Sequence, residues 1–401
     1  MLSMLLLPGC TLDIPPADQY SDPDAVKDEK TARAYLTGIY IEYPHEQFYM
    51  SILGNDFETT PRAKYDVSML DLHNHVQKEI KSFSENLWQE YYKVVADCMA
   101  LRERIDLLPS SDELSVVRSE ASAIEAMAYF DLLKMYAGNY SESLESSGVV
   151  IKTEFGVQTL SLSSIKECTE HISGLLDQAS GVREKCSAGW LSHDAVEMMR
   201  ARLALYKGEY STSLAVCSRL LDGRQLSPGS LKMWTLGDEN VIFAFNNRGA
   251  YYTGIEYSKA EGDYFRTSAS LRPKNGDARH ESYVIDEKFG KYNLANKTGE
   301  EIRYIDNIRI QEAVFIAAES LAAMHRDEAA LDMLNRYLSI CGCPIGEKLE
   351  GSGLASRIMA EKYKEFAGEG RNFFDLKRRG EYGREVIFPI PQSESKYNPN
   401  L

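Results

Sequence analysis

The sequence predicts a mostly α-helical protein, in which tetratricopeptide-like (TPR-like) helical hairpins form a scaffold and a loop-rich excursion contains short β-strands. Apolar residues recur every three or four positions over residues 84–222 and again over residues 302–340, which is the spacing of amphipathic helices. Between these stretches, residues 231–300 lose that period and are rich in Tyr, Gly, Ser and Asn. A chain of 401 residues with 44% apolar side chains can bury a large core around such helices.

The first predicted helices follow one another directly. The helical spacing of apolar residues runs through residues 88–105 and ends at a Leu-Leu-Pro-Ser-Ser turn, residues 107–111. A second helix follows over about residues 114–136. Nearly every face of it is apolar or small, which is typical of a helix with neighbours on both sides. Gly138 and Asn139 are expected to end it.

The later helices repeat this unit. Residues 165–179 have amphipathic spacing, and residues 196–221 form two short amphipathic stretches around a Lys-Gly-Glu turn. Residues 310–338 repeat the pattern once more. A single helical hairpin cannot bury its own apolar face, so we expect the hairpins to stack on one another, as in TPR arrays.

Two segments outside the predicted helices are candidates for ligand binding, because loops on a rigid scaffold commonly contain functional residues. The first is residues 53–84. The second is residues 231–300, which begins with a β-like run at residues 241–245. The predicted ligand-binding residues are Tyr65, His73, Trp234, Tyr251, Tyr252, Tyr257 and Tyr264. Aromatic residues on helix faces are instead expected to be buried packing residues, namely Trp88, Tyr129, Phe130 and Tyr206.

The N-terminus resembles the end of a bacterial lipoprotein signal. Residues 1–7 are almost entirely apolar, and Pro8 and Gly9 precede Cys10. We expect residues 1–10 to be part of a signal whose start lies upstream, with Cys10 acylated. The alternative is an apolar N-terminus on a cytoplasmic protein. No other stretch approaches the roughly 18 to 20 apolar residues that span a membrane, so lipid on Cys10 would be the attachment.

Composition and motif spacing argue against several functions. With 45 basic and 60 acidic residues the net charge is −15, which disfavours nucleic acid as a partner. No phosphate-binding loop, nucleophile elbow or zinc pattern is present, and His73 and His75 have no further ligand at matching spacing. We therefore expect neither enzymatic activity nor a cofactor. The remaining cysteines are expected to be small core residues.

The C-terminal segment, residues 354–401, contains the most specific motifs. It includes Glu369-Gly370, Asp375-Leu376-Lys377-Arg378, Phe388-Pro389-Ile390-Pro391 and Asn398-Pro399. Together with Glu125 to Leu132, Asp277-Ala278-Arg279 and the start at Cys10, these motifs resemble the SusD/RagB family of outer-membrane nutrient-binding lipoproteins. Asn372 departs from the family pattern, which has Arg at that position. From their spacing, Glu369, Arg371, Asp375 and Arg378 are expected to form local ion pairs that attach the last helix to the repeats.

The resemblance implies a single SusD-like domain over residues 11–401, anchored by lipid to the outer membrane and facing the cell exterior. It implies capture of a nutrient, most simply an oligosaccharide, and its delivery to a SusC-like TonB-dependent transporter barrel, with no reaction performed by this chain. Two alternatives stay open. One is a peptide-binding, RagB-like lid, and the other is a TPR-like scaffold for protein–protein interaction.

Overall fold

The computed structural model describes residues 25–228 apart from residue 142, and then residues 240–246, 265–272, 276–279, 284–285, 288–289, 304–343, 348–382 and 387–401. Within these ranges the protein is mostly helical, as predicted. The described α-helices are α1 Glu29–Glu42, α2 Gln47–Leu53, α3 Val67–His73, α4 Gln77–Ile105, α5 Asp112–Tyr136, α6 Ile165–Gln178, α7 His193–Tyr206, α8 Tyr210–Leu221, α12 Gln311–Ala323, α13 Asp327–Ile340, α14 Gly351–Phe366, α15 Arg371–Arg378 and α16 Gln392–Tyr397.

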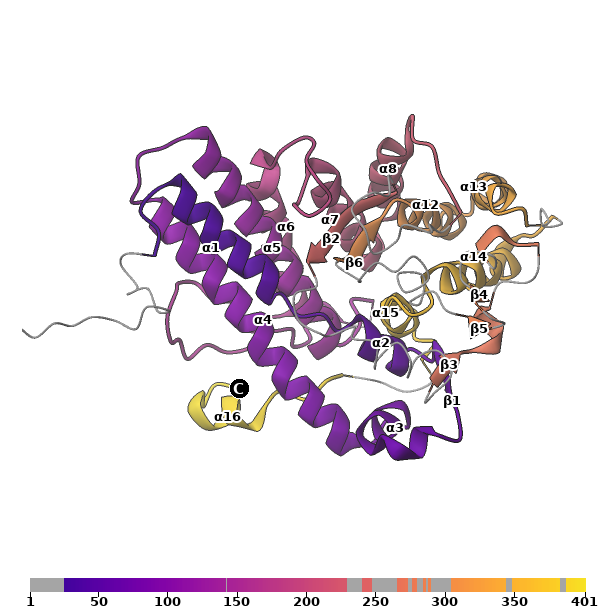
Figure 1. The fold of residues 1–401 in the computed structure, drawn as a ribbon, viewed down its shortest axis with the longest axis horizontal. Coiled ribbons are helices and arrows are strands. Elements are labelled where there is room, and N and C mark those ends of the chain that lie inside the picture. Colours follow the sequence, from indigo (N-terminus) through magenta and orange to yellow (C-terminus); the bar gives the residue numbers. More distant parts are fainter. Residues whose placement is uncertain are drawn as a thin grey trace, which may run out of the picture.

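The helices stack as antiparallel neighbours. α4 packs against α5, α5 against α6, α7 against α8, and α12 against α8, α13 and α14. Figure 1 shows α1, α4, α5 and α6 side by side on one side of the molecule, and α12, α13 and α14 on the other. One hydrophobic core lies among α1 and α4–α8 and reaches α12, and a second lies among α12, α13 and α14. Cys98, Cys168 and Cys217 are buried in the first, as expected for small core residues.

Local sequence explains where several helices begin. Asp28 and Thr31 form a capping box at the start of α1, and Ser164 and Glu167 form another at the start of α6. Ser111 caps α5 through a hydrogen bond from the backbone N–H of Leu114. These side chains accept bonds from N–H groups that have no partner inside the helix, so each helix begins at the residue the sequence specifies.

Residues 53–84 differ from the loop that the sequence predicted. α3 occupies residues 67–73, and the last eight residues, 77–84, are the first turns of α4. The prediction was wrong because polar residues surround the apolar positions at this end of α4. Ile80, Ser84 and Leu87 nevertheless form one buried stripe, which continues the stripe of the rest of the helix.

The described strands form short antiparallel pairs. β1, Phe57–Thr59, pairs with β3, Phe265–Thr267, and β2, Val241–Asn246, pairs with β6, Tyr304–Arg309. A third pair joins β4, Val284–Ile285, to β5, Lys288–Phe289. The predicted β-like run is therefore confirmed as β2. The β1–β3 pair joins the two segments that the sequence identified as candidates for ligand binding.

The predicted burial of helix-face aromatics is confirmed for Trp88, Tyr129 and Phe130. Tyr206 is only half-buried, because its ring lies on the wall of a cavity described below. Among the described helices, none combines the length and the apolar character needed to cross a membrane.

Candidate functional site

A polar surface with an exposed aromatic ring lies where β1 leads into the short 3₁₀-helix Ala63–Tyr65. The Tyr65 side chain is 71% exposed, and the Lys64 Nζ lies 5.2 Å from the centre of its ring. We call this region the β1–β3 surface and define it by its exposed or half-exposed residues: Glu58, Arg62, Lys64, Tyr65, Val67 and Arg266. It combines an aromatic face with charged groups, which are the two kinds of contact that a sugar requires.

Contacts between β1 and β3 fix part of this surface. The Arg266 Nη2 lies 3.2 Å from the Glu58 Oε2, and the backbone N–H of Ala269 donates to the Glu58 Oε1 at 2.9 Å. This backbone bond and the Arg266 charge lower the pKa of Glu58, so its carboxyl is ionised at neutral pH. The Glu58 carboxylate thus joins the two strands at the edge of the exposed surface.

His73, another predicted ligand-binding residue, lies behind this surface and is half-buried. One ring nitrogen, Nε2, lies 3.0 Å from the Phe57 carbonyl oxygen, and the ring centre is 5.8 Å from that of Phe265. His73 therefore contacts both β1 and β3. The other predicted residues, Trp234, Tyr251, Tyr252, Tyr257 and Tyr264, and the predicted lipidation site Cys10, lie outside the described residues.

The C-terminal motif is hydrogen-bonded to the residue that precedes β1. The buried Asp56 carboxylate accepts a hydrogen bond from the backbone N–H of Gly368 at 2.8 Å and one from the Asn372 side-chain amide at 2.7 Å. The Asp56 carbonyl oxygen also accepts from the N–H of Ser268 at 2.8 Å. Asn372, which departs from the family pattern, thus has a defined partner. Asp56 ties β1, β3 and the C-terminal motif together.

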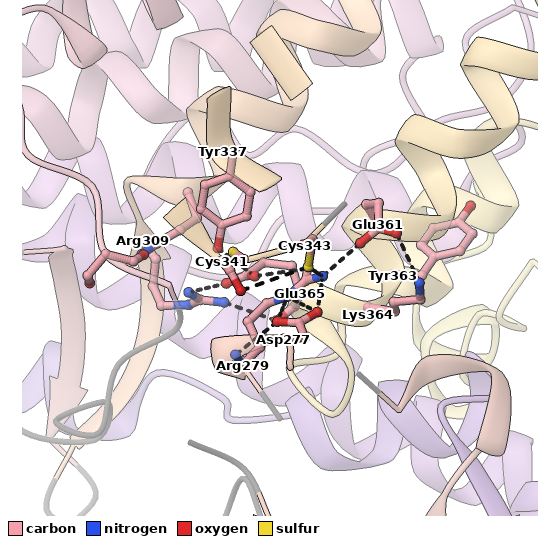
Figure 2. Close-up of polar contacts among 12 residues, drawn as sticks. Asp277, Arg279, Arg309, Tyr337, Cys341, Cys343, Glu361, Tyr363, Lys364 and Glu365 are labelled. Atoms are coloured by element: carbon pink, nitrogen blue, oxygen red, sulfur yellow. Dashed lines mark hydrogen bonds and ion pairs between the residues drawn. The ribbon is translucent and has the colours of Figure 1, made fainter. Parts of the chain in front are cut away.

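Two buried arginines connect the remaining motif residues, as Figure 2 shows. Arg279, from the Asp-Ala-Arg motif, binds Asp277 and Glu361, each with a shortest N–O distance of 2.7 Å. Arg309, at the end of β6, binds Glu369 through two nitrogens at 2.8 and 3.0 Å and binds Glu365 at 3.0 Å. Glu365 also accepts from the Tyr337 hydroxyl at 2.6 Å and lies 3.6 Å from Arg279, so it joins the two arginines.

The two carboxyls that bind Arg279 most closely, those of Asp277 and Glu361, stay ionised although they are buried. Burial alone raises the pKa of Glu361, but the charge and the hydrogen bond of Arg279 outweigh burial, and the pKa lies below its usual value. The same balance of burial against Arg279 lowers the pKa of Asp277. Because its charged groups are paired with one another, this network holds Asp277, β6 and the C-terminal motif together within the fold.

The helix α15 forms a second set of ion pairs, and here the sequence prediction is only partly correct. The local pairs exist, with Arg378 at 3.0 Å from Asp375 and Arg371 at 3.8 Å from Glu369. The closer partners lie on α12, where Arg371 pairs with Glu312 and Arg378 pairs with Glu319 at 2.6 Å. Sequence spacing reveals pairs within one helix but not those between distant helices.

A cavity of about 130 Å³ lies between α2, α5, α7, α12, α14 and α15. Its wall includes Glu46, Gln47 and Met50 near α2, Phe130 and Asp131 on α5, Arg202 and Tyr206 on α7, Glu312 on α12 and Phe374 on α15. Sequence reasoning missed this cavity because its residues come from six helices and the chain between them. The half-buried Tyr206 was the one local signal, since it faces the cavity instead of the helix interface.

The described residues thus form a mostly helical fold with an exposed aromatic surface and an internal cavity. Among the described residues, no group of three or more His, Cys, Asp and Glu side chains is arranged to hold a metal ion. No curated protein sequence matches this chain significantly. A SusD-like family model described as "Starch-binding associating with outer membrane" matches residues 12–182, and the SusD family model matches residues 230–386.

Solved structures agree on the fold. A SusD superfamily protein from Bacteroides fragilis is 18% identical, with a TM-score of 0.81 over 94% of this chain and 100% of that one. A SusD superfamily protein from Bacteroides thetaiotaomicron is 20% identical, with a TM-score of 0.75 over 93% and 99%. A SusD-like carbohydrate binding protein from Bacteroides vulgatus is 15% identical, with a TM-score of 0.76 over 94% and 98%.

This chain belongs to the SusD/RagB family, because the two family models together match most of its length. Membership supports a carbohydrate-binding role in nutrient uptake and association with the outer membrane.

Proposed function

We propose that this protein is a cell-surface lipoprotein that captures an oligosaccharide and delivers it to a TonB-dependent transporter in the outer membrane, without performing a reaction. The β1–β3 surface is the observation that supports this proposal most directly. It presents the exposed Tyr65 ring beside the charged side chains of Arg62 and Lys64. Sugar rings stack their C–H groups on aromatic faces, and sugar hydroxyls bond to charged and amide groups.

The rigidity of this surface also supports a binding role. Tyr65 lies only six residues from the end of β1, whose pairing with β3 is fixed by Asp56 and Glu58. A surface that is already ordered loses little conformational entropy when a ligand binds, which favours affinity. We propose that Trp234, Tyr251, Tyr252, Tyr257 and Tyr264 add further contacts to the same ligand.

Replacing Tyr65 by Ala is expected to weaken oligosaccharide binding by about 1 to 3 kcal/mol, by analogy with the range for nucleobases stacked on protein aromatics. The melting temperature should change little, because the Tyr65 side chain is mostly exposed. Calorimetry against a panel of glycans and peptides measures the affinity. Tyr397→Ala is the matched control, since Tyr397 is 75% exposed but lies on α16.

The outcome of the panel separates the alternatives. Equal loss of affinity in both variants, or no loss in Tyr65→Ala, contradicts a ligand site at the β1–β3 surface. Binding of peptides but not of glycans replaces the proposed ligand with a peptide. If neither class binds, a scaffold for protein–protein interaction becomes the better explanation.

We also propose that lipid on Cys10 of the precursor anchors the protein. Cys10→Ala is expected to release the protein from the membrane fraction and to abolish incorporation of labelled palmitate, because acyl chains contribute about 0.8 kcal/mol per buried methylene and several chains together give stable anchoring. Cys186→Ala provides the control, since Cys186 is a half-buried cysteine within the folded domain. Unchanged labelling in Cys10→Ala would refute the anchor.

Co-purification in mild detergent tests the proposed partner. A β-barrel protein of much larger mass should be recovered with the wild-type chain. Recovery of the monomer alone under several detergents would favour a binding protein that acts without a stable transporter complex.

A further inference from the structure

The cavity between α2, α5, α7, α12, α14 and α15 has the size of one small ring. Its volume is about 130 Å³, and it is partly open to solvent. An engineered protein cavity of about 150 Å³ binds benzene, and one water occupies about 30 Å³ in the liquid. The space therefore exceeds what one or two waters fill, and it accepts a single six-membered ring.

Most of the charged side chains on the cavity wall already have partners in the protein. The Arg202 guanidinium binds both oxygens of Glu312 at 2.8 and 2.7 Å, and Lys134 binds Asp131 at 2.6 Å. Lys362 binds Asp375 at 2.7 Å. Lys377 donates to three backbone carbonyl oxygens at the end of α5, at 2.7, 2.8 and 3.3 Å. A charged ligand would have to compete with these bonds, so the cavity suits a neutral ligand.

One polar atom on the wall remains without a hydrogen bond. Glu46 is 7% exposed, and its Oε2 atom has no hydrogen-bond partner among the described residues. Burial, followed by the nearby charge of Asp131, raises the pKa of the Glu46 carboxyl to about 8. This shift favours the neutral carboxyl, which can donate a hydrogen bond as well as accept one. A buried polar atom without a partner is costly, and a small rotation of the carboxyl towards the cavity would let a ligand hydroxyl satisfy it.

Other side chains on the cavity wall can form hydrogen bonds and ring contacts with a ligand ring that has hydroxyl groups. Gln47 and Asn139 are half-buried side-chain amides, which bond to hydroxyls both as donors and as acceptors. Phe130 and Tyr206 contribute aromatic surface, and their ring centres are 5.5 Å apart at 81°. Carboxyl, amide and aromatic groups are therefore gathered around a ring-sized space.

We infer that this cavity is a second ligand site, which binds one neutral six-membered ring with several hydroxyl groups, such as a single pyranose unit. The site is separate from the β1–β3 surface, because none of the residues that define that surface lines the cavity. Its occupancy does not depend on the proposed function of that surface.

The methyl group of Met50 allows a local measurement. Met50 lies on the cavity wall and is fully buried, whereas Met69 on α3 is half-buried and does not line the cavity. With ¹³C-methyl methionine labelling, the Met50 and Met69 resonances are assigned from Met→Leu variants and followed by NMR. Glucose, galactose, mannose and myo-inositol serve as neutral probes, and lysine and glutamate as charged ones.

A saturable shift of the Met50 signal with a neutral ring, and no shift of Met69, is the expected result. Glu46→Ala should weaken this binding about tenfold, which is 1.4 kcal/mol. Glu46→Gln should retain most of it, because the amide still bonds to a hydroxyl. Tyr206→Ala, at a half-buried position, is expected to cause a similar loss and provides a second variant if Glu46→Ala does not fold.

Three results would overturn the inference: no probe shifts Met50, a charged probe binds more tightly than every neutral ring, or neither Glu46→Ala nor Tyr206→Ala weakens binding. The Tyr65→Ala variant separates this inference from the proposed function. It should lose oligosaccharide affinity while the Met50 shift stays unchanged. If the protein binds an oligosaccharide but no neutral probe shifts the Met50 resonance, the proposed function stands and the cavity site is rejected.

Discussion

Replacing Arg309 by Met is expected to destabilise the protein by about 3 to 5 kcal/mol, because removing one partner leaves buried charges unpaired. Arg309 is almost fully buried and pairs with Glu365 and Glu369. Its guanidinium carbon also lies 4.7 Å from the centre of the Phe366 ring. Methionine fills part of the space but removes the nearest cation of both carboxylates, which leaves Glu365 with Arg279 at 3.6 Å and Glu369 with Arg371 at 3.8 Å. Urea unfolding followed by circular dichroism measures the change.

Arg266→Met is the matched control for this experiment. Arg266 also pairs with a glutamate across two segments, but its side chain is 56% exposed and the N–O distance to Glu58 is 3.2 Å. Exposed pairs contribute about 0 to 1 kcal/mol, so the control should unfold nearly as the wild type does. Equal stability of the Arg309 and Arg266 variants would show that the buried network does not stabilise the fold.

Gly370→Ala is expected to cost about 2 to 4 kcal/mol, for two reasons that add. Gly370 has a φ of 73°, a left-handed conformation that costs other residues about 1 to 2 kcal/mol. A Cβ at this position would also lie 2.7 Å from the Cα and 2.8 Å from the carbonyl oxygen of Gln47, so α2 and α15 would have to separate. Thermal and urea unfolding both measure the loss.

Gly380→Ala isolates the conformational part of this cost. Gly380 has a φ of 66°, but a Cβ there would meet no atom within 4 Å. This variant should therefore lose only about 1 to 2 kcal/mol. If the two glycine variants are equally stable, close packing of α15 against α2 contributes nothing to stability.

Helix positions were predictable because they depend on neighbouring residues in the chain. Capping residues such as Ser111 and the Gly208 turn, with its φ of 74°, specify helix ends locally. The start of α4 was not predicted, because the buried residues at this end of the helix, such as Ile80, are single apolar positions among charged residues. Whether such a stripe is buried depends on the residues that pack against it, which the local pattern does not contain.

The candidate site was predictable only in part for the same reason. The prediction placed Tyr65 outside the helical stripes, and its side chain is exposed. The roles of Asp56 and Glu46 were not foreseen, because a single acidic residue has no distinguishing pattern among the 60 in the chain. The role of Asp56 depends on its hydrogen bonds from Gly368 and Asn372, which lie more than 300 positions later in the chain. Ion pairs within α15 were visible, and those with α12 were not.

The pairing of β2 with β6 has a consequence for how such a protein diversifies. Asn246 and Tyr304 are direct partners in this ladder, so the ends of residues 247–303 leave the helical scaffold side by side. Paired strand residues lie only about 4.5 to 5.5 Å apart, and the entropy of closing a loop grows slowly with its length. Within that stretch, β3 pairs with β1 and Arg279 binds Glu361, so these residues are fixed by the fold. Selection can therefore lengthen, shorten or exchange the residues between these fixed points while the helices keep their packing. New nutrient preferences would then arise without rebuilding the frame that presents them.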